Sequence, residues 1–71
     1  MEPSEIFELI IKADERLKYA TDAKAAARIE QARGFLIQAR DEARAIGNQA
    51  LVDQAERRLS DLDGLAAGHD G

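Results

Sequence analysis

Apolar residues recur along the first third of the chain at the spacing of an α-helix. They step by four and three positions, which places them on one helix face: Ile6, Ile10, Ala13, Leu17 and Ala20. Leu9 widens this face. Pro3 suits the first turn, and Glu5 and Glu8 put negative charge near the positive end of the helix dipole. The pattern predicts a helix over residues 4–20.

A second and longer series with the same spacing follows: Ala25, Ile29, Ala32, Leu36, Ala39, Ala43 and Ile46. On one straight helix the two apolar faces would lie about 140° apart. A break near Thr21 and Asp22 lets both faces meet one core, and either side chain can cap a new helix. We therefore expect a second helix over 22–46. The alternative is one helix that continues through Thr21 and pairs with a second copy of the chain.

Glycine and asparagine mark the next boundary. Gly47 suits the left-handed position after a helix end, and Asn48 can cap the helix that follows. The third apolar face consists of Val52, Ala55, Leu59 and Leu62, with Leu51 alongside. A third helix is expected over 48–63, and a flexible tail over 64–71. Because the connections are short, the sequence predicts an all-α, three-helix antiparallel bundle in a single domain, residues 1–63.

Composition limits how stable such a bundle can be. The chain has 71 residues, 45% of them apolar, and no cysteine. Much of the apolar content is alanine, which buries little area, so the core is expected to be thin. Chains of this size sit near zero net stability without a further source of stabilisation. This favours self-association, and a homodimer is one expected state.

Charge and hydropathy limit the binding partners and the cellular locations that the chain is expected to have. The formal net charge of −4 disfavours attraction to nucleic acid and to anionic membranes. No apolar run reaches the length of about 20 residues that a membrane span needs. The opening residues, Met-Glu-Pro-Ser-Glu, are acidic where a secretory signal is basic. We expect a cytoplasmic protein with no membrane contact.

Two families resemble parts of this sequence. Residues 32–62, from Ala-Arg-Gly-Phe-Leu to Arg-Arg-Leu-Ser-Asp-Leu, look like a junction between tetratricopeptide-type repeats, with small residues on facing helices and a Gly-Asn turn. The overall layout, three helices in about 60 residues, is also similar to microtubule-interacting and transport domains. The first resemblance implies tetratricopeptide-like packing, and both imply a module that binds other proteins.

The residues that catalysis needs are scarce. The chain contains one histidine, no cysteine, two serines and one threonine, and His69 lies in the expected tail. Neighbouring acids such as Asp41 and Glu42 diverge by about 100° on a helix, so they do not form a paired site. We therefore predict no catalytic, cofactor-binding or metal-binding residues, and no enzyme activity.

Three arginines of the expected second helix form a basic stripe. Arg33, Arg40 and Arg44 lie within about 40° of one another around the helix. One interpretation is a site for nucleic acid or another anionic ligand. The other is salt bridging to acids of the neighbouring helices, both of which carry net negative charge.

Four large apolar residues fall outside the predicted core faces: Phe7, Ile11, Phe35 and Ile37. Either the buried face is wider than the pattern indicates, or these side chains form a second apolar surface for a partner. Gly34, in mid-helix, would permit another helix to approach closely. We predict a small helical protein-interaction module that self-associates or binds a partner helix through Phe7, Ile11 and Ile37. The alternative is a regulatory binder of nucleic acid or an anionic ligand through Arg33 and its two neighbours on the stripe.

Overall fold

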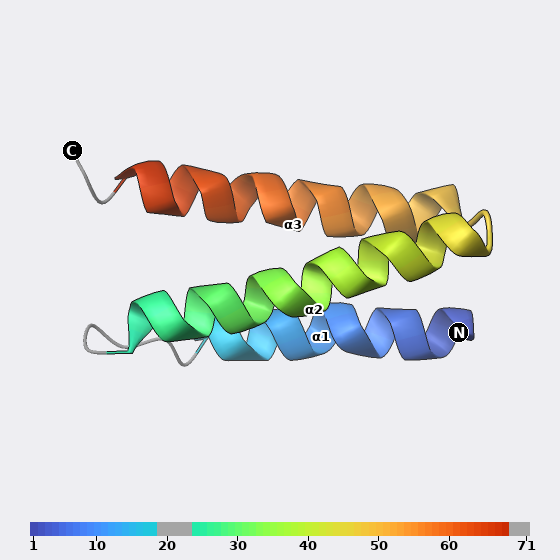
Figure 1. The fold of residues 1–71 in the computed structure, drawn as a ribbon, viewed down its shortest axis with the longest axis horizontal. Helices are drawn as coiled ribbons and strands as arrows, with labels where there is room; N and C mark the ends of the chain where they lie inside the picture. Colours follow the sequence, from blue (N-terminus) through green and yellow to red (C-terminus); the bar gives the residue numbers. More distant parts are fainter. Residues whose placement is uncertain (19–23, 69–71) are drawn as a thin grey trace.

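The computed structural model describes residues 1–18 and 24–68, the last four of these as backbone only. Three helices follow one another: α1 (Pro3–Lys18), α2 (Ala25–Ala45) and α3 (Gln49–Gly68). Each runs antiparallel to the one before it (Figure 1), and the described residues contain no strand. The predicted all-α, three-helix antiparallel bundle is confirmed.

The start of α1 is capped from within its own first turn. The carbonyl of Glu2 accepts the backbone N–H of Ile6 at 3.1 Å, so Glu2 stands at the N-cap. The side chain of Glu5 in turn accepts the backbone N–H of Glu2 at 2.9 Å. Pro3 occupies the first helical position, where a missing N–H costs nothing.

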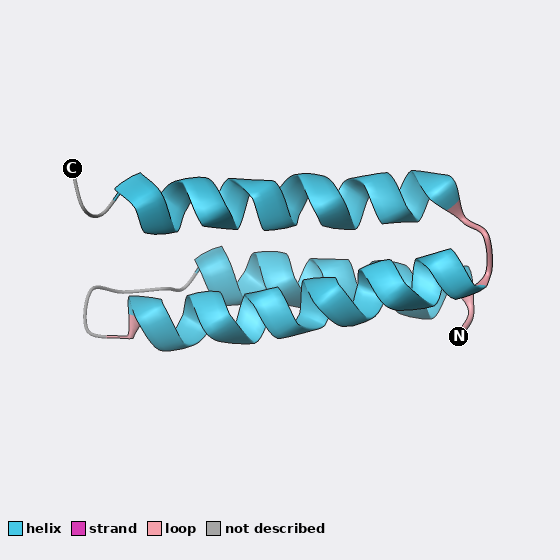
Figure 2. Cartoon of the chain, turned by 45° about the horizontal axis from the view of Figure 1, so that its top comes forward, coloured by secondary structure: helices cyan, strands magenta, loops and turns pink. Residues whose placement is uncertain are grey.

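The start of α2 differs from the prediction. The helix begins at Ala25 with Lys24 at the N-cap and no side-chain capping bond, so the predicted start at residue 22 is wrong. A lysine side chain has no acceptor, and the alanines that follow are the strongest helix formers. Thr21 and Asp22, the predicted caps, lie outside the described residues. The antiparallel arrangement of α1 and α2 (Figure 2) excludes one straight helix running through both.

The turn between α2 and α3 forms as predicted. Gly47 has a φ of +69°, the left-handed conformation that favours glycine. The N–H of Asn48 donates to the carbonyl of Ala43 at 2.9 Å, and the N–H of Gly47 to that of Arg44 at 3.1 Å, which together form a Schellman motif. The Asn48 side chain then accepts the N–H of Leu51 at 3.2 Å and caps α3.

The third helix is longer than predicted. It continues to Gly68, so the expected tail over 64–71 begins inside α3, and residues 69–71 lie outside the described part. An isolated glycine costs a helix only about 1 kcal/mol relative to alanine, so Gly64 does not end it.

The core lies between the three helices and is built from small and branched side chains. Its fully buried members with large side chains are Ile6, Ile10, Leu36 and Leu62, and alanines from all three helices fill the spaces between them. Helix α2 packs closely against both neighbours, whereas α1 and α3 make little contact with each other. Ile46, predicted to be in the core, is 42% exposed because it follows the end of α2.

Candidate interaction surface

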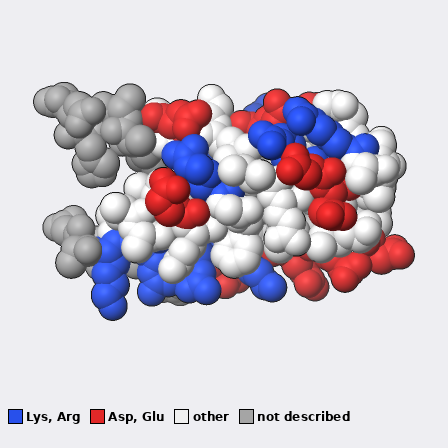
Figure 3. Space-filling model, viewed as in Figure 1, with Lys and Arg blue, Asp and Glu red and all other residues white. Residues whose placement is uncertain are grey.

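The basic stripe of α2 is tied to acidic side chains. Arg33 Nη1 lies 2.9 Å from Asp63 Oδ1, and Arg44 Nη2 lies 3.3 Å from Glu56 Oε1, so two arginines bridge α2 to α3. Arg33 also lies near Glu30. This face of the molecule shows basic atoms beside acidic ones (Figure 3). These contacts support the interpretation of the stripe as salt bridging between helices.

The remaining stripe arginine differs from the other two, because its carboxylate partner lies on its own helix. Arg40 pairs with the adjacent Asp41, with Nη2 and Oδ1 3.1 Å apart. The hydrogen bond that Arg33 donates to Asp63 raises the pKa of Arg33 above its ordinary value. All three arginines therefore have a carboxylate partner within the chain, and two of these partners lie on α3.

Ile37 lies on the same side of α2 as these arginines. It follows Arg33 by four positions and precedes Arg40 by three, which places it within about 60° of both around the helix. Its side chain is 38% exposed. Ile37 is therefore an apolar residue that lies among the charged residues bridging α2 and α3.

Phe7 and Ile11 lie on a different surface, the side of α1 that faces α3. Their side chains are 45% and 39% exposed. Asp14 shares their side of the helix, within about 20° of Phe7. Its carboxylate accepts a hydrogen bond from Arg58 Nε at 3.0 Å, so this side of α1 is turned toward α3. Few other contacts close the seam between the two helices.

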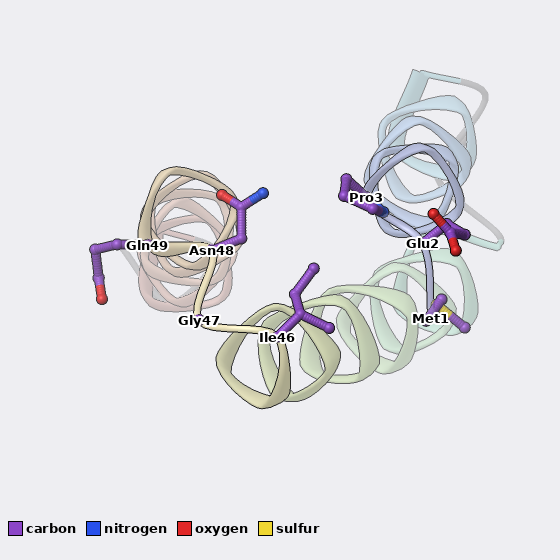
Figure 4. A pocket seen from close by; sticks show the side chains of 7 residues that line it. All are labelled: Met1, Glu2, Pro3, Ile46, Gly47, Asn48 and Gln49. Atoms are coloured by element: carbon purple, nitrogen blue, oxygen red, sulfur yellow. The ribbon is translucent and has the colours of Figure 1, made fainter.

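The apolar surface continues to the end of the bundle. Pro3 stands one turn before Phe7, and it lines a shallow, open depression with Ile46 and five other residues: Met1, Glu2, Gly47, Asn48 and Gln49. The side chains of Pro3, Ile46 and Asn48 point into this space, whereas Gln49 points away from it (Figure 4). We call Pro3, Phe7, Ile11 and Ile46 the apolar strip.

The structure separates the predicted partner-binding residues into two surfaces. On α3, Arg58 lies about 140 to 160° around the helix from Asp63 and Glu56. Arg58 contacts the side of α1 that carries Phe7 and Ile11, and the two acids contact the side of α2 that carries Ile37. Phe7 and Ile11 therefore lie on a different surface from Ile37, and the three residues do not form the single docking surface that was expected.

Other polar groups of the described residues form no metal site and leave no buried atom unpaired. Lys12, Glu15, Arg16 and Arg28 line an open charged depression. No group of three or more described acids and histidines is placed to hold a metal ion. Within the same residues, no buried side-chain nitrogen or oxygen lacks a hydrogen-bond partner. His69 lies outside the described part of the chain.

Comparisons with protein-family models, with curated proteins and with solved structures find no match to this chain. No helix in the described part of the chain combines the length and hydropathy that crossing a membrane requires.

Two features of the surface were absent from the sequence-based predictions. Ile46 was assigned to the core because it continues the spacing of the second series, although the glycine after it ends the helix there. The Asp14–Arg58 pair joins residues 44 positions apart, which no local spacing reveals. The sequence feature that could have pointed to this contact is the seven-residue step from Phe7 to Asp14, because it places both residues on one side of α1.

Proposed function

We propose that this chain is a protein-interaction module that binds another polypeptide along the apolar strip. One observation carries the proposal: Phe7 and Ile11, one turn apart, are both substantially exposed beside a sparsely packed seam. Fully burying a side chain of this size contributes about 1.5 to 3 kcal/mol. A partner helix that covers both would gain a useful part of its binding free energy there.

Because the core is thin, binding that buries more apolar surface would stabilise the module. Among the described residues, alanine supplies five of the twelve that are buried in the core, so the core contains few large side chains. An interface with another polypeptide would bury the further apolar surface that the core does not supply. We further propose that α2 and α3 pair in the tetratricopeptide-like manner that the resemblance implies, which the complete burial of Ala39, Ala43 and Ala55 supports. The proposed location is the cytoplasm, in agreement with a chain that has no cysteine.

The proposal is tested by the size of the native complex. We expect the tagged chain in a cell extract to elute above its monomer mass of 7.8 kDa in size-exclusion chromatography. Phe7→Asp and Ile11→Asp place a charge within the strip and should shift elution to the monomer position. Ile37→Asp is the matched control, because Ile37 is equally exposed but lies on the other surface.

Two results would contradict the proposal. Elution of the wild-type chain as a monomer at native abundance is one. Loss of the complex in Ile37→Asp but not in Phe7→Asp is the other, and it would move the site to the seam between α2 and α3. Circular dichroism of each variant separates lost binding from lost folding.

The alternative, an anionic-ligand site on Arg33, Arg40 and Arg44, has less support from the contacts. Each of these guanidinium groups already faces a carboxylate, so a bound anion would have to displace an acidic partner. Replacing all three arginines with glutamine tests this alternative. Loss of a salt-dependent interaction in a variant that stays folded would favour it over the apolar strip.

A further inference from the structure

A depression between α1 and α2 is lined mainly by basic side chains. Lys12, Glu15 and Arg16 of α1 form one wall, and Arg28 of α2 forms the other. Lys12 and Arg16 stand one turn apart, on the side of α1 that lies about 100 to 180° around the helix from its apolar strip residues. Arg28 lies about 120 to 160° around α2 from the stripe arginines that contact acids. The depression is therefore a surface separate from both the apolar strip and the basic stripe.

The basic side chains of this depression differ from those of the stripe in having no acidic partner. The three stripe arginines each lie within hydrogen-bond distance of a carboxylate. Lys12, Arg16 and Arg28 take part in none of the ion pairs or side-chain hydrogen bonds that the described residues form. Arg28 is also partly buried. The donors of all three side chains are therefore available to a ligand.

The charges of the chain are distributed unevenly with respect to this depression. Residues 12–28 contain five basic and three acidic side chains, a net charge of +2, whereas the rest of the chain contains five basic and eleven acidic ones, a net charge of −6. Along the lower edge of the molecule in Figure 3, basic atoms gather toward the left end and acidic atoms toward the right. The bundle is 37 Å long, several times the screening length of about 8 Å in physiological salt. A small anion in the depression is therefore attracted by the local positive charge, whereas a long polyanion would also meet the acidic remainder of the chain.

We propose that this depression binds the dianionic phosphate group of a small soluble molecule. Three cations and the carboxylate of Glu15 give the lining a net charge of +2, which two negative charges on a phosphate neutralise. Guanidinium groups donate paired hydrogen bonds to phosphate oxygens, and a lysine ammonium adds a point charge. Because Arg16 and Arg28 come from neighbouring helices, their donors approach the ligand from two sides. The site does not depend on the apolar strip, so it is a binding function beyond the one proposed above.

NMR titration of the full, ¹⁵N-labelled chain tests this site with two probes, inorganic phosphate and glycerol phosphate. Sodium chloride keeps the ionic strength constant, and acetate serves as the monoanionic control. We expect both phosphates to shift the backbone amide signals of residues 12–16 and of Arg28 in a saturable manner. The signals of the three stripe arginines should stay in place. Acetate should bind about tenfold more weakly than phosphate, because it carries half the charge and fewer acceptor oxygens.

Three glutamine variants separate the site from general effects of charge. Arg28→Gln should raise the dissociation constant for phosphate about tenfold, because it removes a charged donor from the lining. Glu15→Gln should lower that constant several-fold, because it removes the negative charge that opposes the ligand. Arg57→Gln is the matched control, since Arg57 is exposed on α3 and its replacement changes the net charge as Arg28→Gln does. It should leave the dissociation constant unchanged. Circular dichroism of each variant verifies the fold.

Several results would overturn the proposal. If neither phosphate produces a saturable shift, or if acetate binds as tightly as phosphate, the depression is not a phosphate site. Equal weakening by Arg28→Gln and Arg57→Gln would mean that only the net charge matters. Shifts confined to the stripe arginines would place the anion between α2 and α3 instead. Binding to vesicles that contain phosphatidic acid, without binding of either soluble phosphate, would make a membrane surface the ligand. None of these results bears on the apolar strip, which the size of the native complex tests separately.

Discussion

At the scale of single residues, neighbours in the sequence have opposite environments. Ile6 is fully buried while Phe7 is exposed, Ile10 is buried while Ile11 is exposed, and Leu36 is buried while Ile37 is exposed. Each step of one residue turns a helix by about 100°, which moves a side chain from the core face to its edge. Hydrophobicity alone therefore does not say which of two adjacent apolar residues stabilises the fold.

The pair Leu36 and Ile37 allows this difference to be measured. Leu36→Ala should lower the free energy of unfolding by about 2 to 5 kcal/mol, because it leaves a cavity at a fully buried position. Ile37→Ala should lower it by much less, since that side chain already contacts water. Urea denaturation followed by circular dichroism gives both values. Equal losses would mean that Ile37 is a core residue and that the described packing of α2 is wrong.

Among the described residues, Asp14 and Arg58 form an ion pair across the loosely packed boundary between α1 and α3. Both side chains are partly exposed, so we expect a coupling energy below about 1 kcal/mol. A double-mutant cycle with Asp14→Asn and Arg58→Gln, read by urea denaturation, measures this coupling. A coupling of several kcal/mol would contradict the loosely closed seam on which the proposed function depends.

At the scale of helices, the sequence predicted what is local and missed what depends on distant residues. The 4-and-3 spacing located three helices, and Gly47 with Asn48 located the turn, because both signals lie within a few residues. The start of α2 and the end of α3 were misplaced. Side chains that can cap or break a helix do so only where packing lets the helix begin or end. The spacing of Phe7 and Ile11 predicted that they are exposed. Their separation from Ile37 depends on how the helices pack, which the ion pairs between helices reveal.

Two glycines should respond in opposite ways to the same substitution. Gly47→Ala should destabilise the protein by about 1 to 2 kcal/mol, because its positive φ is unfavourable for a residue with a Cβ atom. Gly34→Ala should stabilise it by up to about 1 kcal/mol, since Gly34 is helical and an added Cβ would meet no neighbouring atom. Thermal unfolding of both variants checks the two signs. A destabilising Gly34→Ala at high protein concentration would mean that another helix approaches that position.

At the scale of the whole molecule, two of the three pairs of helices pack closely and the third does not. Helix α2 packs tightly against α1 and α3 and is linked to α3 by Arg33 and Arg44, whereas α1 and α3 remain loosely joined. Three residues of the apolar strip, Pro3, Phe7 and Ile11, belong to α1, and Phe7 and Ile11 lie on the side of α1 that faces α3. A fourth helix placed there would cover Phe7 and Ile11 and complete the burial that the alanine-rich core lacks. The side of the bundle between α1 and α3 therefore combines sparse helix packing with the exposed side chains of Phe7 and Ile11.

Photo-crosslinking from within the strip tests this central claim most directly. A photoreactive phenylalanine analogue at position 7, in the full chain in its native cells, should capture another polypeptide in high yield. The same analogue at Arg57, an exposed position of α3 away from the strip, should capture little. Equal yields at the two positions, or no product at position 7, would contradict the conclusion that the apolar strip is an interaction surface.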